Sequence, residues 1–230
     1  MNNNPFVIAF DGMNGVGKTT VCQKVEKLLQ RTGARIERIR LPGAHQLAST
    51  RSIRTVLDLC GKDLSPLARA SLYLADFSEY VDKFVKQNIL NVDILLTDRS
   101  ILSTLIYQVT LEKTIEDIFP IFLNKTKEYI FPNILVFLKP PNFKTAMNQI
   151  KASKGESEGS IAGYGSKDME WYEKLHNAYI QVYEEYGWPT NCLPTCWTTN
   201  EDIAYLSNIV IENLLHTEII PEFEKWKAIH

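Results

Sequence analysis

The most informative stretch of this sequence is Asp11-Gly12-Met13-Asn14-Gly15-Val16-Gly17-Lys18-Thr19-Thr20. From Gly12 to Thr19 it fits the Walker A pattern G-x-x-x-x-G-K-[ST]. An unbroken apolar run of strand length, Phe6–Phe10, precedes it, and apolar residues at helical spacing follow it through Gln30. The order of strand, glycine loop and helix is the context in which this pattern binds phosphate. The sequence therefore predicts a nucleotide site.

The residue types in this loop match the chemistry of a nucleotide site. Its glycines let the backbone turn so that N–H groups point at a phosphate, and the helix start adds free N–H groups and a positive dipole end. Lys18 would reach the β- and γ-phosphates, and the Thr19 hydroxyl would hold Mg²⁺. A turn that only caps a helix would explain one glycine, but not three glycines followed by Lys-Thr. The expected ATP-binding residues are Gly12, Asn14, Gly15, Val16, Gly17, Lys18, Thr19 and Thr20.

Length and composition predict one cytoplasmic α/β domain over residues 1–230. A chain of 230 residues is long enough for one such domain with a large core and short for two. The net charge of −2 argues against non-specific nucleic-acid binding, which needs a basic surface. The four cysteines form no metal-binding set, so we expect free thiols in a reducing compartment. With no apolar signal core and no bilayer-length run, we expect no membrane partner.

Strand-like and helical segments alternate along the chain, which predicts a parallel sheet with helices on both faces. Five strands are expected, at Phe6–Phe10, Ala34–Leu41, Val92–Thr97, Ile134–Leu138 and within Thr190–Trp197. The helical stretches after the first are expected near residues 46–59, 65–90, 101–109, 114–128, 143–152, 168–186 and 200–215, with a helical tail at 217–230. Residues 153–167, rich in glycine and serine, are the most loop-like stretch.

A second group of polar residues follows the third expected strand. Asp98 and Arg99 would lie at its carboxyl end, the edge where open α/β sheets bind ligands. A carboxylate there can hold Mg²⁺, and an arginine can bind phosphate through two hydrogen bonds. Thr19 and Asp98 are therefore the expected metal residues. The alternative is an Asp–Arg ion pair that caps the next helix.

These residues resemble those of the thymidylate kinase family. The resemblance rests on Phe10–Thr20, on Arg40-Leu41-Pro42-Gly43 and on the run Asp98–Gln108. The corresponding family patterns are an acidic-Gly-x-Asp-Gly-x-Gly-Lys-Thr loop, an Arg-x-Pro segment and Asp-Arg-Tyr-x-x-Ser-Ser-x-Ala-Tyr-Gln. Order and spacing agree over roughly residues 6–215. The resemblance implies a P-loop kinase fold with a short lid, ATP and Mg²⁺ as cofactors, transfer of phosphate from ATP to a deoxypyrimidine monophosphate (dTMP to dTDP), and a homodimer.

The resemblance also implies roles for individual side chains. Arg40 and Arg99 would lie near the acceptor phosphate, and Tyr73 would stack on the base. Thr104 would face the pyrimidine edge and Tyr107 the deoxyribose carbon that lacks a hydroxyl, although all three of these helical side chains could instead simply pack. The acceptor-binding residues implied are Asn14, Arg40, Tyr73, Phe77, Arg99, Ser103, Thr104, Tyr107 and Gln108, and the catalytic residues are Lys18, Arg99, Asp98 and Asp11. Residues 153–167 match the lid, and Thr198–Glu201 match the loop near adenine.

Three positions depart from the family pattern. Asn14 stands where an aspartate is common, and Phe77 stands where many members have an arginine that reaches the thymine edge. No arginine follows Arg99, although the family supplies one from the loop or the lid. We therefore expect a lysine as the lid cation; the lid residues implied are Lys151, Lys154, Tyr164 and Lys167.

Two other functions remain open at this point. Asp98-Arg99-Ser100 also resembles the Glu-Arg-Ser run of deoxynucleoside kinases, whose acceptor is a 5′-hydroxyl that needs a general base. Asp11 could serve as that base. A binding protein that uses ATP as a switch would instead hydrolyse ATP slowly, without an acceptor.

Overall fold

The computed structural model describes residues 4–12, 16–42, 47–61, 63–111, 113–114, 116–139, 170–171, 173–175, 177–179, 193–198 and 208–229. The expectations for Asn14, Gly15, the helix at 143–152 and the lid at 153–167 lie outside these residues. The same holds for the lid side chains Lys151, Lys154, Tyr164 and Lys167, and for Glu201 of the loop near adenine.

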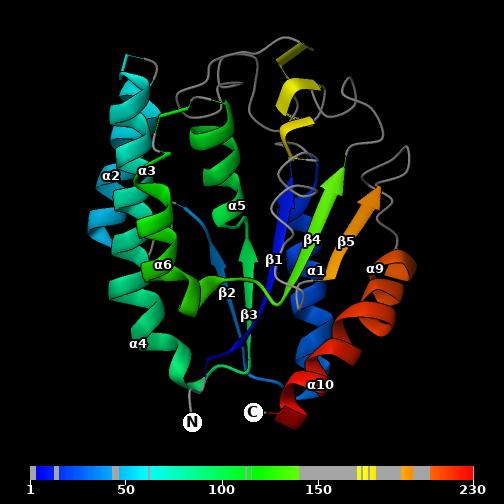
Figure 1. The fold of residues 1–230 in the computed structure, drawn as a ribbon. Helices are drawn as coiled ribbons and strands as arrows, with labels where there is room; N and C mark the ends of the chain where they lie inside the picture. The colour runs from blue at the N-terminus through cyan, green and yellow to red at the C-terminus, as the bar shows by residue number, and fades with distance from the viewer. Residues whose placement is uncertain are drawn as a thin grey trace.

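Five parallel strands form one sheet in the order β2-β3-β1-β4-β5 (Figure 1). The strands are β1 (Phe6–Gly12), β2 (Ile36–Arg40), β3 (Ile94–Asp98), β4 (Ile134–Lys139) and β5 (Leu193–Thr198). Both β1 and β3 are buried along their whole length, as their near-continuous apolar sequences require in a sheet covered on both faces. Pro194 lies on the edge strand β5, where a missing N–H is tolerated. The predicted five-stranded parallel sheet is confirmed.

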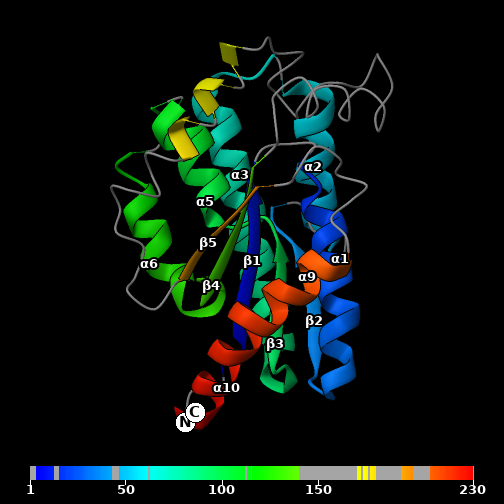
Figure 2. The same cartoon turned by 90° about the vertical axis from the view of Figure 1, so that its right-hand side faces the viewer.

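Helices cover both faces of the sheet. In the edge-on view, α1 (Lys18–Leu29) and α9 (Asn208–Leu214) lie on one face, and α3 (Pro66–Tyr80), α5 (Ile101–Thr104) and α6 (Phe119–Ile130) on the other (Figure 2). Helix α2 (Ala48–Cys60) packs against α3. The shorter pieces are the 3-10 turns Gln30–Thr32 and Ile89–Asn91, helix α4 (Lys86–Asn88), the π-helical turns Val81–Val85, Leu105–Leu111 and Leu215–Ile219, and helix α10 (Ile220–Ile229).

Helix boundaries follow local chemistry. Ser65 caps α3, with its Oγ accepting a hydrogen bond from the Ala68 N–H at 3.3 Å, as the Ser-Pro pair predicts. The helix predicted at 114–128 begins later, at Phe119, which corrects that prediction. The reason is Pro120, which fits the first turn of α6 but would remove a hydrogen bond from the interior of a longer helix.

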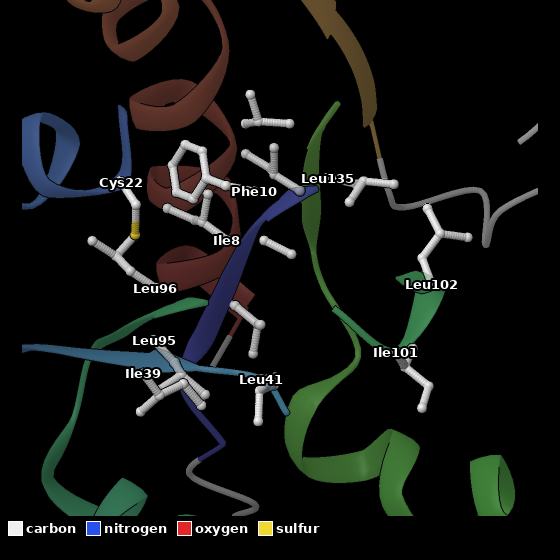
Figure 3. Close-up of a cluster of buried hydrophobic side chains, with 14 of the residues drawn as sticks. Ile8, Phe10, Cys22, Ile39, Leu41, Leu95, Leu96, Ile101, Leu102 and Leu135 are labelled. Carbon is white, nitrogen blue, oxygen red and sulfur yellow. The ribbon is translucent and has the colours of Figure 1, made fainter. Parts of the chain in front are cut away.

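The core extends on both sides of the central strand. Ile8 and Phe10 of β1 lie close to Leu96 of β3 and Cys22 of α1, all buried (Figure 3).

Among the described residues, no helix combines the length and apolar character needed to cross a bilayer.

The C-terminal helix packs on the beginning of β1. The Phe6 ring lies 5.5 Å from that of Phe223 and 5.9 Å from that of Trp226, between ring centroids. Both ends of the chain therefore lie at the amino edge of the sheet, opposite the edge where the strands end (Figure 1).

Candidate active site

Two glycines fix the path of the backbone where β1 leaves the sheet. Gly12 has φ +133°, and a Cβ there would lie 2.3 Å from the carbonyl oxygen of Leu138 on β4. Gly17 has φ +85° and directly precedes α1. Side chains other than hydrogen are thus excluded by contact at Gly12 and disfavoured by backbone conformation at Gly17. These glycines bring the start of α1 to the carboxyl end of β1.

The Lys18 ammonium is buried beside this loop. Its Nζ donates a hydrogen bond to the carbonyl oxygen of Gly12 at 2.9 Å. Burial lowers the pKa of Lys18, and nearby Arg99 lowers it further, whereas Asp98 and Asp11 act in the opposite direction. The lysine therefore lies among the charges at the ends of β1 and β3.

The two expected metal residues are in contact. The Thr19 hydroxyl donates to Oδ2 of Asp98 at 2.5 Å, joining the first turn of α1 to the end of β3. A hydroxyl and a carboxylate are oxygen ligands of the kind Mg²⁺ prefers. Within the described part of the chain, no cluster of three or more His, Cys, Asp or Glu side chains could hold a metal. Mg²⁺ bound here would thus complete its coordination with water and phosphate oxygens, as it usually does at phosphate sites.

Asp11 is completely buried, and its carboxylate accepts five hydrogen bonds. Oδ1 accepts from the Gly12 N–H at 2.7 Å and from the hydroxyls of Ser103 at 2.8 Å and Tyr179 at 3.0 Å. Oδ2 accepts from the N–H of Ser100 at 3.0 Å and from its hydroxyl at 2.6 Å. The donors come from three separate parts of the chain, so Asp11 joins them at one point.

Arg99 holds an unusual backbone conformation next to this carboxylate. Its φ of +78° is uncommon for a residue with a side chain. Its N–H donates to the carbonyl oxygen of Phe10 at 2.9 Å, and its Nη1 donates to Ser103 Oγ at 3.1 Å. The cap of α5 is Ser100, whose Oγ accepts from the Leu102 N–H at 3.1 Å. An Asp–Arg pair is therefore not needed to cap this helix.

Most of the remaining acceptor candidates lie near this edge of the sheet or on α5 and the turn after it. Arg40 at the end of β2 is in register with Asp98. Five other candidates are buried: Tyr73, Ser103, Thr104, Tyr107 and Gln108. Phe77 is different, because its fully buried ring meets Phe122 of α6 edge-on at 5.3 Å and belongs to the hydrophobic core.

Two aromatic residues near the site are not among the site residues that the sequence predicts. Tyr179 contacts Asp11, and Trp171 lies 6.2 Å from Tyr107 between ring centroids. Their spacing, with Leu175 and Ala178, predicts a buried helical face. That pattern predicts burial but not the partner, because Asp11 is 168 residues away from Tyr179 in the sequence.

A family model described as thymidylate kinase matches residues 10–189. The chain belongs to the thymidylate kinase family. A thymidylate kinase of Nitratidesulfovibrio vulgaris (strain DSM 19637 / Miyazaki F) is 37% identical over 102 residues, 44% of this chain and 46% of that protein. One of Ureaplasma parvum serovar 3 (strain ATCC 27815 / 27 / NCTC 11736) is 25% identical over 185 residues, 79% of this chain and 78% of that protein.

The first curated thymidylate kinases are matched over about half of their own length. The similarity in fold covers more of the chain than these similarities in sequence. The crystal structure of thymidylate kinase from Ehrlichia chaffeensis superposes with a TM-score of 0.65 at 19% identity, covering 93% of this chain and 99% of that one. This similarity shows that the chain has the thymidylate kinase fold.

Proposed function

We propose that the protein transfers the γ-phosphoryl group of ATP to a deoxypyrimidine monophosphate, converting dTMP to dTDP. The observation that carries this proposal is the 2.5 Å contact between Thr19 and Asp98, which joins the phosphate-binding loop to the Asp-Arg run. The buried Lys18 and the half-buried Arg99 lie at the same edge of the sheet. Positive charge, the two residues proposed to hold Mg²⁺ and the proposed phosphate-binding loop thus lie together, which supports the proposal.

The proposed reaction needs positioning and charge neutralisation more than covalent chemistry. The backbone of residues 12–20 would hold the ATP phosphates, and Lys18 would contact their β- and γ-oxygens. Thr19 and Asp98 would hold Mg²⁺, which supplies positive charge to the phosphate oxygens when bound. Arg99, fixed by Phe10 and Ser103, would orient the acceptor phosphate.

We assign the acceptor to the space bounded by β2, α3 and α5. Arg40 and Arg99 would both bind the phosphate of the acceptor, and Tyr73 would stack on its base. Ser103, Thr104, Tyr107 and Gln108 would line the sugar and base. Phe77 cannot donate to the base, and its place against Phe122 supports a site that lacks the family's arginine. We therefore expect weaker selectivity for thymine than in arginine-bearing relatives.

The hydrogen bonds of Asp11 favour a monophosphate over a nucleoside as acceptor. A general base must have a free lone pair facing the proton that it abstracts. Five donors already occupy this carboxylate, and the side chain is fully buried. We therefore propose Asp11 as a positioning residue and not as the base that a deoxynucleoside kinase requires.

The lid side chains complete the proposal. Of the eight arginines none follows Arg99, so we propose that Lys151, Lys154 or Lys167 supplies the last positive charge. A lysine is a hydrated point charge on a flexible stem and should act less strongly than arginine. Alanine at one of these three positions should lower kcat; three fully active variants would leave the charge to Lys18 and Mg²⁺.

The deciding experiment is ADP release from ATP·Mg²⁺ with dTMP, with thymidine, and with no acceptor. We expect ADP formation only with the monophosphate, and its loss in Lys18→Ala with the fold intact. Turnover with thymidine would identify a deoxynucleoside kinase. Slow hydrolysis that no acceptor accelerates would identify an ATP-switched binding protein.

We also propose a cytoplasmic homodimer that contacts through α2, α3 and α6. Apolar side chains are exposed there on α2, α3 and α6: Val56, Leu59, Leu67 and Ile121. Leu59 is 77% exposed and Ile121 66%, and contact with a second copy would remove this apolar surface from water. Sedimentation should give twice the monomer mass for the wild type and a smaller mass for Leu59→Asp. A monomeric wild type would refute the dimer.

A further inference from the structure

One helical segment places several side chains over the candidate site. Among residues 170–179, Leu175, Ala178 and Tyr179 are buried, and Trp171 is half-buried against Tyr107. The segment lies above the carboxyl ends of β1 and β4 (Figure 1). It follows directly on the stretch 153–167 that matches the family's lid.

The Tyr179 hydroxyl lies inside the hydrogen-bond network of Asp11. It donates to Asp11 Oδ1 at 3.0 Å, and its oxygen is 3.2 Å from Ser103 Oγ and 3.4 Å from the carbonyl oxygen of Gly12. A phenol has one proton, so the shorter contact to a carboxylate receives it. The hydroxyl thus joins Asp11 to the segment after the lid.

The ring of Tyr179 alone does not account for this position. It stacks on Phe137 of β4 at 5.1 Å between centroids, a contact that phenylalanine would make equally well. A buried hydroxyl adds a desolvation cost unless its hydrogen bond is used. The hydroxyl therefore has a function that the packing of the ring does not supply.

The same network leads to Arg99. Ser103 Oγ gives its proton to Asp11 at 2.8 Å and accepts from Arg99 Nη1 at 3.1 Å. Tyr179 touches both Asp11 and Ser103; Ser103 accepts from the guanidinium, and Asp11 holds Ser103. Because both hydroxyl protons go to Asp11, loss of the Tyr179 hydroxyl would act first on Asp11, then on Ser103 and, through it, on the orientation of Arg99.

We propose that Tyr179 is a positioning residue that ties the helix after the lid to Arg99 through Ser103 and Asp11. The inference rests on the proposed function, in which Arg99 binds the acceptor phosphate. It places the effect of Tyr179 on the acceptor and not on ATP. The position of the helix and the orientation of Arg99 are thereby coupled.

The test compares Tyr179→Phe with Tyr80→Phe. Both changes remove the hydroxyl of a buried tyrosine whose ring stacks on a phenylalanine, and Tyr80 lies outside the candidate site, stacked on Phe84 at 5.0 Å. For Tyr179→Phe we expect kcat/KM for dTMP to fall by about tenfold or more, with KM for ATP unchanged. Tyr80→Phe should keep both constants.

A double-mutant cycle separates positioning from structural support. If Tyr179 acts through Arg99, Tyr179→Phe should cost less than about threefold in an Arg99→Lys background. Additive losses, equal losses toward ATP and dTMP, or full activity of Tyr179→Phe would each overturn the inference. Should Tyr179→Phe fail to fold, Ser103→Ala removes the middle of the network and must show the same loss confined to the acceptor.

The two levels of the proposal can fail separately. A wild type that is inactive on monophosphates refutes the proposed function, and the inference with it. A wild type that is active, with a Tyr179→Phe variant equal to it, refutes only the role of Tyr179.

Discussion

At the scale of single residues, the backbone of Arg99 is held against its own preference. A side chain at φ +78° meets its own backbone, which costs about 1 kcal/mol or more, and the hydrogen bond to Phe10 keeps the residue there. Strain of this kind is retained where the side chain must point in a required direction. Here that direction leads to Ser103.

This conformation reverses the usual order of alanine and glycine. Arg99→Gly and Arg99→Ala both lose the guanidinium, but only alanine keeps the strained Cβ. We expect the glycine variant to have the larger free energy of unfolding in urea, by about 1 kcal/mol. An alanine variant that is as stable as the glycine variant would show that φ is free to relax.

Asp76 is a second residue in an unfavourable environment. Its carboxyl group is completely buried on α3, and neither oxygen has a hydrogen-bond partner within the part of the chain that the structure describes. Burial raises the pKa of this carboxyl from 3.8 to about 7, while the Arg54 guanidinium acts in the opposite direction. The charged form is therefore disfavoured in the folded protein.

The raised pKa predicts a loss of stability with rising pH. Below about pH 4 the carboxyl is protonated in both the folded and unfolded states, so its contribution to the free energy of unfolding is fully present. That contribution is lost as pH rises through about 7, and the loss is at most about 4 kcal/mol. Asp76→Asn should match the wild type near pH 4 and exceed its free energy of unfolding at pH 8.

The control for this prediction is the exposed Asp63, which precedes the same helix. Asp63→Asn changes an exposed carboxylate and should not raise the free energy of unfolding at pH 8. Parallel curves for wild type and Asp76→Asn would mean that the Asp76 carboxyl is hydrated or paired in solution.

At the scale of elements, the contact between β1 and β4 limits which residue can end β1 at position 12. Alanine at Gly12 would drive a Cβ to 2.3 Å from the Leu138 carbonyl oxygen, and the backbone of a central strand cannot move aside. We expect Gly12→Ala to lose about 3 kcal/mol or more of unfolding free energy.

Gly33 is a matched control for Gly12. It also has a positive φ, of +81°, but a Cβ there meets nothing within 4 Å. Gly33→Ala should therefore lose only about 1 kcal/mol, the cost of the left-handed conformation. Equal losses in chemical denaturation would show that conformation, and not the contact with Leu138, decides the effect at Gly12.

Elements were predictable from the sequence where the deciding chemistry is local. The strand, loop and helix around Lys18 and the cap at Ser65 depend on neighbours within a few residues. Apolar spacing predicts too early a start for α6, because Pro120 fits only the first turn of the helix that begins at Phe119. No local pattern predicts the partner of Tyr179, because that partner depends on how the helical segment at 170–179 meets β1.

At the scale of the whole molecule, the C-terminal helix stabilises the fold from the side opposite the site. Phe223→Ala should remove the contact with Phe6 and lower the unfolding free energy by about 3 kcal/mol. KM for ATP and for dTMP should stay at wild-type values. Ile229→Ala, at a side chain 80% exposed, should change neither. A changed KM in Phe223→Ala would show that the two edges of the sheet are coupled.

The central place of β1 also has a consequence for protein synthesis. The first strand to leave the ribosome pairs with β3 and β4, and the N–H of Val7 donates to Asn133 Oδ1 at 2.7 Å across 126 residues. Four of the five donors to Asp11 arrive with residues 100, 103 and 179. A nascent chain thus contains the phosphate-binding sequence long before it can order it. We expect dTMP binding to begin only after the segment that carries Tyr179 has emerged.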